Sequence, residues 1–207
     1  MVEQSEAIIR LSKEQIGPAS EMLTRAFLND PKLTSIIPDE QTRGEKGKHL
    51  FAFELRYGLN YGRVYATSSN LEGVAVWLSG DRSEITLWRA MRSGGFALQK
   101  GLGKEAMERL TLFSDQVDSY HKKHVPSRHC YLFFIGVDPH LHGKGFGGKL
   151  IRPMLERMDG EQMACYLNTQ NEKNIGLYEH FGFTVVEQVR LPGTDFLHTC
   201  MIRKPRS

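Results

Sequence analysis

The stretch Gly136–Leu150, GVDPHLHGKGFGGKL, carries the densest chemical signal in the sequence. It overlaps the end of Tyr131–Val137, YLFFIGV, a continuous apolar run that is typical of a buried central strand. Glycines then cluster ahead of a segment with helical apolar spacing. Glycine lets the backbone approach a ligand closely, and the first N–H groups of a helix have no internal partner. The stretch therefore predicts an anion site, most naturally for a phosphate or pyrophosphate.

Two familiar phosphate-binding motifs match this stretch in residue pattern but not in structural context. A flexible turn without a ligand is the structural alternative. Gly143, Gly145 and Gly148 fit G-x-G-x-x-G, the dinucleotide pattern. That pattern should follow its strand directly, whereas Asp138–His142 intervene here. The nucleotide P-loop is nearly matched as well, yet Leu150 stands where a magnesium-binding Ser or Thr is required. A nucleotide-binding module is therefore disfavoured.

The same stretch resembles the acetyl-CoA pyrophosphate loop of the GNAT superfamily of N-acetyltransferases. That loop starts Val-x-Pro and continues with Gln or Arg, two further residues, a glycine, one residue, and Gly or Ala. Val137 and Pro139 match the start, and Gly145 and Gly147 match the glycines. His142 departs from the pattern, because the family usually has Gln or Arg there.

A second motif, NEKNIGLYEHFGF at Asn171–Phe183, resembles the other cofactor motif of this superfamily. In the family, this helix lies beside the pantetheine arm of CoA. The asparagine that matches Asn171 contacts the arm, and the tyrosine that matches Tyr178 lies near the sulfur. Structural alternatives exist: Asn171 fits an N-cap, Tyr178 fits a core aromatic with a satisfied hydroxyl, and Asn174 fits either role. The resemblance covers Tyr131–Phe183.

The resemblance implies an acyl-CoA-dependent N-acetyltransferase with acetyl-CoA as co-substrate and no metal. The acetyl group would move to a primary amine by direct attack in a ternary complex. A backbone N–H near Ile135–Val137 would polarise the thioester carbonyl, and Tyr178 would protonate the departing thiolate. A water chain is one alternative for the base. The acidic alternatives are Asp30, Glu54, Glu72 and Asp81.

The cofactor-binding residues that the resemblance predicts come from the central strand, the glycine-rich turn and the second motif. They are Ile135, Gly136, Val137, His142, Gly143, Lys144, Gly145, Phe146, Gly147, Gly148, Asn171, Asn174 and Tyr178.

The acceptor side is predicted from the polar, poorly patterned sequence that remains, since binding loops often have this character. Ala26–Glu40, with part of His49–Tyr57, is expected to form one wall of the acceptor pocket. The helices of Glu84–His124 are expected to cover or border it. Asp30 and Glu54 are the predicted substrate-binding residues, and a small-molecule amine is the expected acceptor. Alternatives are a protein or peptide amine, and a non-catalytic acyl-CoA-binding or sensing domain.

The order of elements predicts one α/β domain over 1–207 with a mixed, mostly antiparallel sheet. The resemblance further implies that the sheet has about seven strands with a splayed central pair, and that helices cover both of its faces. Expected parts are 1–80 with N-terminal strands and acceptor-side helices, 81–125 as a helical insertion, and 129–203 as the acetyl-CoA-binding half. Segments including Ala26–Glu40 and Gly73–Leu78 are also similar to the puromycin N-acetyltransferase branch.

Most strands and helices are predicted from apolar spacing and turn residues, with Ser12 as the cap of the first helix. The predicted strands are Ala7–Leu11, Arg63–Thr67, Gly73–Leu78, Tyr131–Val137, Ala164–Leu167, Phe183–Leu191 and Phe196–Arg203. The predicted helices are Lys13–Leu28, His49–Leu59, Glu84–Met91, Lys104–His124, Gly147–Met158 and Asn171–His180.

The composition limits the partners and the compartment. The net charge is +3 and the basic residues are dispersed, so no nucleic-acid partner is expected. There is neither a signal-peptide core nor a stretch of membrane-spanning length, which predicts a cytoplasmic monomer or homodimer without a membrane partner. Three widely spaced cysteines are predicted to be buried free thiols.

The histidines are ambiguous in the sequence. His121 and His124 are three residues apart on a predicted helix, which suits a metal pair. No third ligand is evident, so a solvated helix face is predicted for them. His129 and His198 lie at or in predicted strands, where each would either line the acceptor pocket or be structural.

Overall fold

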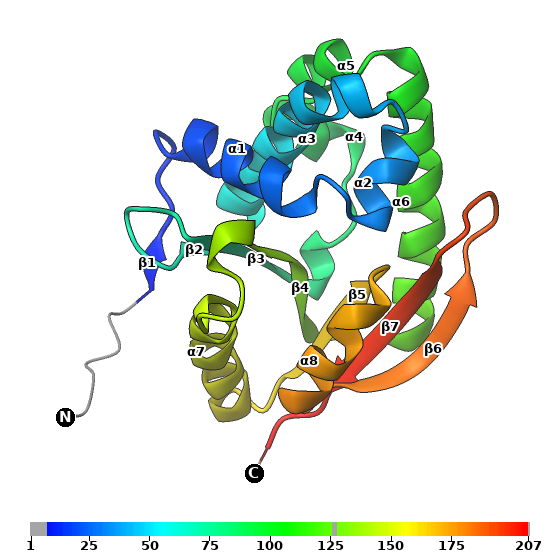
Figure 1. The fold of residues 1–207 in the computed structure, drawn as a ribbon. Helices are drawn as coiled ribbons and strands as arrows, with labels where there is room; N and C mark the ends of the chain where they lie inside the picture. Colours follow the sequence, from blue (N-terminus) through cyan, green and yellow to red (C-terminus); the bar gives the residue numbers. More distant parts are fainter. Residues whose placement is uncertain (1–7, 126–127, 207) are drawn as a thin grey trace.

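Seven strands form one mixed sheet in the computed structural model, which describes residues 8–125 and 128–206 (Figure 1). The order is β1-β2-β3-β4-β5-β7-β6, and β4–β5 is the one parallel pair among the described strands. The strands are β1 (Ile9–Arg10), β2 (Gly62–Ala66), β3 (Gly73–Ser79), β4 (His129–Val137), β5 (Ala164–Thr169), β6 (Thr184–Arg190) and β7 (Leu197–Arg203).

The central strands β4 and β5 separate along their length. Their pairing runs from His129 opposite Ala164 to Leu132 opposite Leu167, and then ends. β4 continues to Val137 while still paired with β3 on its other side. The predicted splayed pair is therefore confirmed, and it opens at the end of β4 that leads into the glycine-rich turn.

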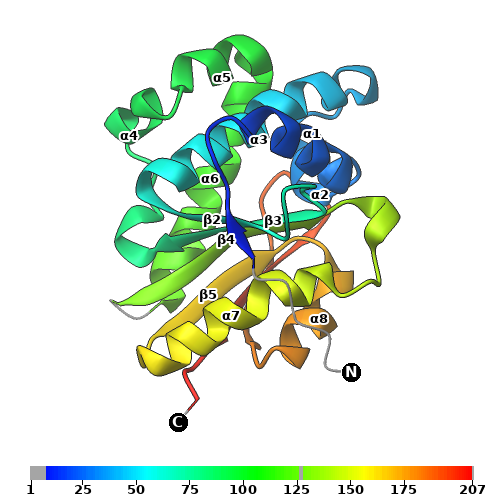
Figure 2. The same cartoon turned by 90° about the vertical axis from the view of Figure 1, so that its left-hand side faces the viewer.

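Helices cover both faces of the sheet, as predicted (Figure 2). Along β3, Val74 and Val76 belong to the core under α1–α6, whereas Ala75 and Trp77 belong to the core under α7 and α8. One face carries α1 (Ile16–Phe27), α2 (Pro31–Ile36), α3 (Glu40–Tyr61), α4 (Leu87–Arg92), α5 (Gly95–Leu102) and α6 (Lys104–His124); the other carries α7 (Phe146–Gly160) and α8 (Ile175–His180).

The first helix begins later than predicted, and Ser12 does not cap it. α1 starts at Ile16 with Gln15 as its N-cap residue, and Gln15 uses its side-chain oxygen to accept the Ser12 backbone N–H at 3.0 Å. Pro18 explains the start, because proline lacks an N–H and is tolerated in a helix only near its first turn. The first strand is confined to Ile9–Arg10 within the described residues.

Two helical starts with aspartate caps were not predicted. α3 has 22 residues and begins at Glu40, where the Asp39 side chain accepts the Gln41 N–H at 3.1 Å. No helix was predicted at α2, where Asp30 is the cap and Pro31 occupies the first turn. An aspartate followed by an acidic residue or proline is a start signal for a helix.

The remaining elements agree with the predictions to within a few residues. α5 fills the glycine-interrupted segment between α4 and α6, and the last two strands, β6 and β7, pair antiparallel as a hairpin. The three cysteines, Cys130, Cys165 and Cys200, are free and buried, which confirms that prediction. None of the helices in the described part of the chain combines the length and apolarity that crossing a membrane requires.

Candidate active site

The glycine-rich turn presents unpartnered backbone N–H groups to open space. Gly143 and Gly145 adopt positive φ angles of 78° and 84°, which glycine accommodates readily. Gly145 is the N-cap of α7, and no side chain caps this helix. A Cβ added at Gly143, Gly145 or Gly147 would meet no atom within 4 Å. The start of α7 therefore has the room and the partial positive charge that suit an anion.

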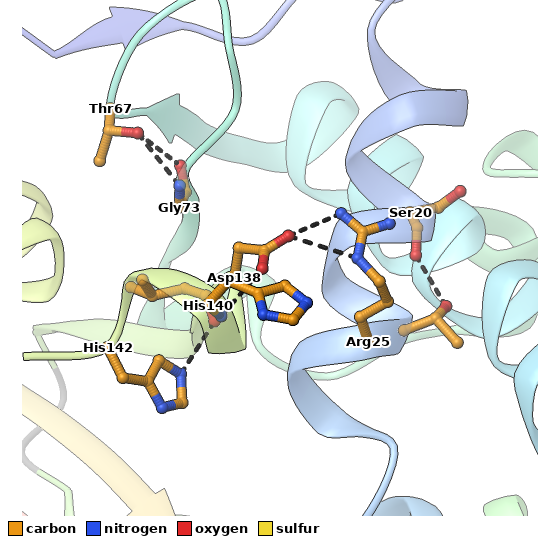
Figure 3. Close-up of polar contacts among 9 residues, drawn as sticks. Ser20, Arg25, Thr67, Gly73, Asp138, His140 and His142 are labelled. Atoms are coloured by element: carbon orange, nitrogen blue, oxygen red, sulfur yellow. Dashed lines mark hydrogen bonds and ion pairs between the residues drawn. The ribbon is translucent and has the colours of Figure 1, made fainter.

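Three polar contacts hold the start of this turn (Figure 3). Asp138 accepts from the Arg25 guanidinium of α1 at 2.7 Å and from the His140 backbone N–H at 3.1 Å. The hydrogen bond from Arg25 keeps the pKa of Asp138 below its ordinary value. His142 turns back and its Nε2 donates to the Val137 carbonyl at 3.1 Å. This ring nitrogen is thus engaged within the turn, at the position that departs from the family pattern.

One other glycine in the predicted cofactor set, Gly136, has a packing reason. A Cβ on Gly136 would lie 2.7 Å from Leu23 and 2.8 Å from Phe27, so Gly136 lets α1 pack closely on β4. A Cβ on Gly148 would lie 2.7 Å from the Arg152 guanidinium, which is the flexible end of a long side chain. Packing within the protein therefore accounts for Gly136, unlike the open positions in the turn.

Tyr178 of α8 is 7% exposed and packs edge-to-face with Phe183, with ring centroids 6.2 Å apart. The residues that the structure describes give its hydroxyl no hydrogen-bond partner, which argues against a core tyrosine with a satisfied hydroxyl. Burial, and then the charge of Asp30, raises the pKa of Tyr178 well above its ordinary value. The phenol therefore keeps its proton at neutral pH. Asn171 caps the short turn Glu172–Asn174, where its side chain accepts the Lys173 N–H at 3.2 Å.

A cavity of about 610 Å³ lies over the splayed strands. Asn174 and Tyr178 line it on the side of the second motif, and Ile135 of β4 lines its floor. Asp30 and Glu54, the predicted substrate-binding residues, line the same cavity. Residues of α4, α5 and α6 complete the lining. The chain segments assigned from the sequence to the cofactor and acceptor sides thus meet at one space.

Only one carboxylate oxygen of Glu54 has a partner among the described residues. Its side chain is 4% exposed, and Oε1 forms an ion pair with the Lys32 ammonium at 2.7 Å. Oε2 is buried and lacks a hydrogen-bond partner among the described residues. The Lys32 ammonium also lies 5.7 Å from the centroid of the Phe133 ring. Asp30 accepts the Lys32 backbone N–H at 2.9 Å, and burial raises the pKa of Asp30.

The two other acids considered as the base lie outside the cavity lining. Glu72 accepts from the hydroxyls of Thr67 and Ser68 in the turn between β2 and β3, at 2.7 and 2.8 Å. Asp81 is exposed and forms an ion pair with Arg82 at 3.0 Å. Both carboxylates have local structural roles.

Asp118 and Tyr131 also line the cavity, and the sequence analysis missed them. Burial raises the pKa of Asp118 to about 6. The Tyr131 hydroxyl accepts from the Asn168 amide at 2.7 Å. Burial, and then the charge of Asp118, raises the pKa of Tyr131 far above its ordinary value. The sequence did contain a signal for Asp118. This residue flanks Val117 on the buried face of α6, and acidic side chains are rarely buried without a partner or a function.

The histidine predictions need correction. His121 is buried, not solvated, and its Nε2 lies 2.9 Å from Nε2 of His129. His124 instead contacts Glu187. His129 and His198 are buried, and neither lines the cavity. Within residues 8–125 and 128–206, no group of three His, Cys, Asp or Glu side chains is placed to hold a metal ion.

Comparison with known proteins identifies the class. Residues 111–183, which contain both cofactor motifs, match the model of the Acetyltransferase (GNAT) family. An uncharacterized N-acetyltransferase of Schizosaccharomyces pombe is 25% identical over 189 residues, which cover 88% of this chain and 76% of that protein.

Solved structures share the fold over almost the whole chain. One, described as histone acetyltransferase HPA2 and related acetyltransferase from Corynebacterium glutamicum, has a TM-score of 0.68 and 21% identity, with 99% of this chain and 98% of that chain covered. Arylalkylamine N-acetyltransferase 2 from Aedes aegypti has a TM-score of 0.58 and 12% identity, with 96% and 98% covered. The chain is thus similar to the GNAT acetyltransferases in sequence over residues 111–183, and it shares the fold of solved acetyltransferases.

Proposed function

We propose that this protein transfers an acetyl group from acetyl-CoA to the primary amine of a small molecule. The observation that carries the proposal is the cavity that joins Tyr178 and the splayed strand β4 to an excess of acidic side chains. Lys32 is the one basic residue in its lining, so three negative charges are in excess when all groups are ionised. Such a cavity attracts an amine, which is a cation at neutral pH. The acidic residues are Asp30, Glu54, Asp115 and Asp118.

In this proposal, acetyl-CoA would extend from the start of α7 to the cavity. The pyrophosphate would bind the N–H groups at the start of α7, where Gly143, Gly145 and Gly147 leave open space. The pantetheine arm would enter the gap where β4 and β5 separate and pass Asn174. The thioester would then reach the cavity, with a backbone N–H near Ile135–Val137 polarising its carbonyl.

The reaction requires proton transfers before and after one acyl transfer. The acceptor ammonium loses a proton, for which Asp30, Glu54 and Asp118 are the carboxylates at the cavity. The amine nitrogen attacks the thioester carbon, a C–N bond forms, the C–S bond breaks, and the nitrogen releases its second proton to solvent to give the neutral amide. Tyr178 gives its proton to the departing thiolate and regains one through solvent. The products are the N-acetylated amine and free CoA.

The helical insertion supports a small acceptor over a protein. α4, α5 and α6 all contribute to the lining, so helices enclose the acceptor side on the face away from α7 and α8. A peptide in extended form needs an open groove beside the thioester, whereas a small amine fits an enclosed site.

The test combines turnover and binding. We expect free thiol to appear when the protein is mixed with acetyl-CoA and a panel of primary amines, and calorimetry to show CoA binding with little NAD or ATP binding. Tighter binding of NAD or ATP than of CoA would overturn the proposal. CoA binding without thiol release from any amine or lysine peptide would identify a non-catalytic acyl-CoA-binding domain instead.

A further inference from the structure

Three large apolar side chains line the cavity and are nevertheless exposed. Leu87 on α4 is 79% exposed, Met91 on α4 is 43% exposed, and Phe96 on α5 is 72% exposed. Because they face both the cavity and solvent, they form its mouth, and we refer to them as the apolar rim. Exposed clusters of apolar side chains at a cavity mark a binding surface. Trp88, on the same helix and 66% exposed, does not line the cavity.

Two of the acidic groups in the lining lie where the cavity reaches β4 and α8, which we call its floor. Glu54 is paired with the Lys32 ammonium, and that ammonium lies 5.7 Å from the centroid of the Phe133 ring of β4. The charge of Asp30 acts on the Tyr178 hydroxyl of α8. The cavity therefore carries negative charge at its floor and apolar side chains at its rim.

Glu54 has a buried carboxylate oxygen without a partner at the floor of the cavity. Its buried Oε2 has no partner among the described residues, although Oε1 is paired with Lys32. A buried carboxylate oxygen without a donor is costly. A ligand ammonium group in the cavity would provide that donor.

We propose that the acceptor is a primary amine with an apolar alkyl or aryl body. Its ammonium group binds at the floor to Glu54, and its body lies against the rim of Leu87, Met91 and Phe96. This inference rests on the proposed function and narrows its substrate class. A diamine or polyamine would place a second ammonium group among the rim side chains, beside α4, whose charged residues are Arg89 and Arg92.

The first test measures kcat/KM for n-butylamine, n-hexylamine and n-octylamine at saturating acetyl-CoA. Each buried methylene contributes about 0.8 kcal/mol, so kcat/KM should rise about fourfold per methylene. 1,6-Diaminohexane, which matches hexylamine in length, should be at least about tenfold poorer. A preference for the diamine, or for Nα-acetyl-lysine methylamide, would overturn the inference while leaving the proposed function in place.

The second test uses Phe96→Ala with Trp88→Ala as the matched control. Phe96→Ala should raise KM for hexylamine about tenfold and leave kcat and KM for acetyl-CoA unchanged, because the rim contact is the same in ground and transition states. Trp88→Ala should change none of these values. An unchanged KM for hexylamine in Phe96→Ala contradicts the inference. A change in the ratio of kcat/KM for hexanoyl-CoA to that for acetyl-CoA in Phe96→Ala would also contradict the inference, because the rim would then hold the acyl chain and not the amine.

The outcomes separate the two proposals. If hexylamine reacts no better than butylamine, the apolar-body inference fails and the acetyltransferase proposal stands. If CoA binds, but no amine reacts and none binds in calorimetry, both fail together.

Discussion

Asp30 and Tyr178 are far apart in the sequence but line the same cavity. The charge of Asp30 contributes to the raised pKa of the Tyr178 hydroxyl. Asp30 caps α2 in the acceptor-side half, whereas Tyr178 lies on α8 in the second cofactor motif. Because both residues line the same cavity, an amine bound near Asp30 and a thiolate near Tyr178 would lie in one reaction site. Because its pKa is raised, the phenol is in its protonated form at neutral pH, which is the form that a proton donor requires.

Tyr178→Phe tests this role directly. Only a hydroxyl is removed, and it makes no hydrogen bond with a described residue, so folding and CoA affinity should be retained. We expect kcat to fall about 10²-fold, the lower end of positioned acid catalysis, because CoA thiolate is already a fair leaving group. Steady-state kinetics and a thermal melt on the same variant provide the measurement. A full kcat in Tyr178→Phe would exclude the residue from the mechanism.

Gly147→Leu tests the pyrophosphate site better than a change at Gly145. Gly145 needs its positive φ, so a side chain there strains the backbone, whereas Gly147 has no such angle and a Cβ there meets no atom within 4 Å. We expect Gly147→Leu to raise the Kd for CoA at least about tenfold, because the side chain occupies the space of the phosphates.

Gly160→Leu is the control for this change, since Gly160 ends the same helix and a Cβ there also meets no atom. Calorimetric titration of CoA should show wild-type affinity for Gly160→Leu, and both variants should melt near the wild-type temperature. Equal CoA affinity in the two variants would mean that the start of α7 does not hold the cofactor.

The sequence predicted the glycine-rich turn more completely than the cavity, and the reason is physical. The turn around Gly143 and Gly145 depends on local backbone geometry, which glycine residues reveal directly. The acceptor cavity depends on how α3 and α6 pack over β4, which local spacing does not specify. Asp118 flanks the buried Val117 in the sequence of α6, but its position near Tyr131 depends on this tertiary packing.

Local signals also explain the errors at helix ends and histidines. Asp39 and Asp30 both act as N-caps, and a reading based on capping would have extended α3 and found α2. His121 was misassigned because a histidine on a helix with many charges resembles a surface residue. Its partner, His129, comes from a strand and is brought to it by tertiary packing.

Asp118→Asn should stabilise the protein near neutral pH. Its pKa is raised by burial from an ordinary 3.8 to about 6, so the folded state binds more protons than the unfolded state between these values. The associated stability is present below pH 3.8 and is lost as pH rises through 6. Asparagine does not ionise, so the Asp118→Asn variant should keep this stability as the pH rises. We expect a gain of about 1–2 kcal/mol in unfolding free energy at pH 7.5, after allowing for solvent screening.

Urea unfolding at pH 7.5 and pH 4 would check this expectation, because the gain should shrink towards zero at the lower pH. Asp115→Asn, on the same helix but exposed, should change stability by less than about 0.5 kcal/mol at both values. A less stable Asp118→Asn at pH 7.5 would show that the carboxylate makes a favourable contact in the folded state.

His198→Leu should weaken the acid sensitivity of the fold. Burial lowers the pKa of His198 from 6.5 to about 4, so its stabilising effect is complete above pH 6.5 and is lost as pH falls through 4. Its Nε2 has no partner within the described chain, and Nδ1 contacts the Gln170 amide at 2.8 Å. Leucine should therefore be tolerated, because Gln170 also donates to Asn168 at 3.0 Å.

The measurement is the unfolding free energy at pH 7.5 and pH 4.5 for wild type, His198→Leu and the exposed control His180→Gln. Wild type and His180→Gln should lose the same amount on acidification, and His198→Leu should lose about 2–3 kcal/mol less. His121, whose pKa burial also lowers to about 4, keeps some acid sensitivity in the variant. Equal losses in all three proteins would show that His198 is not a neutral buried histidine in the folded state.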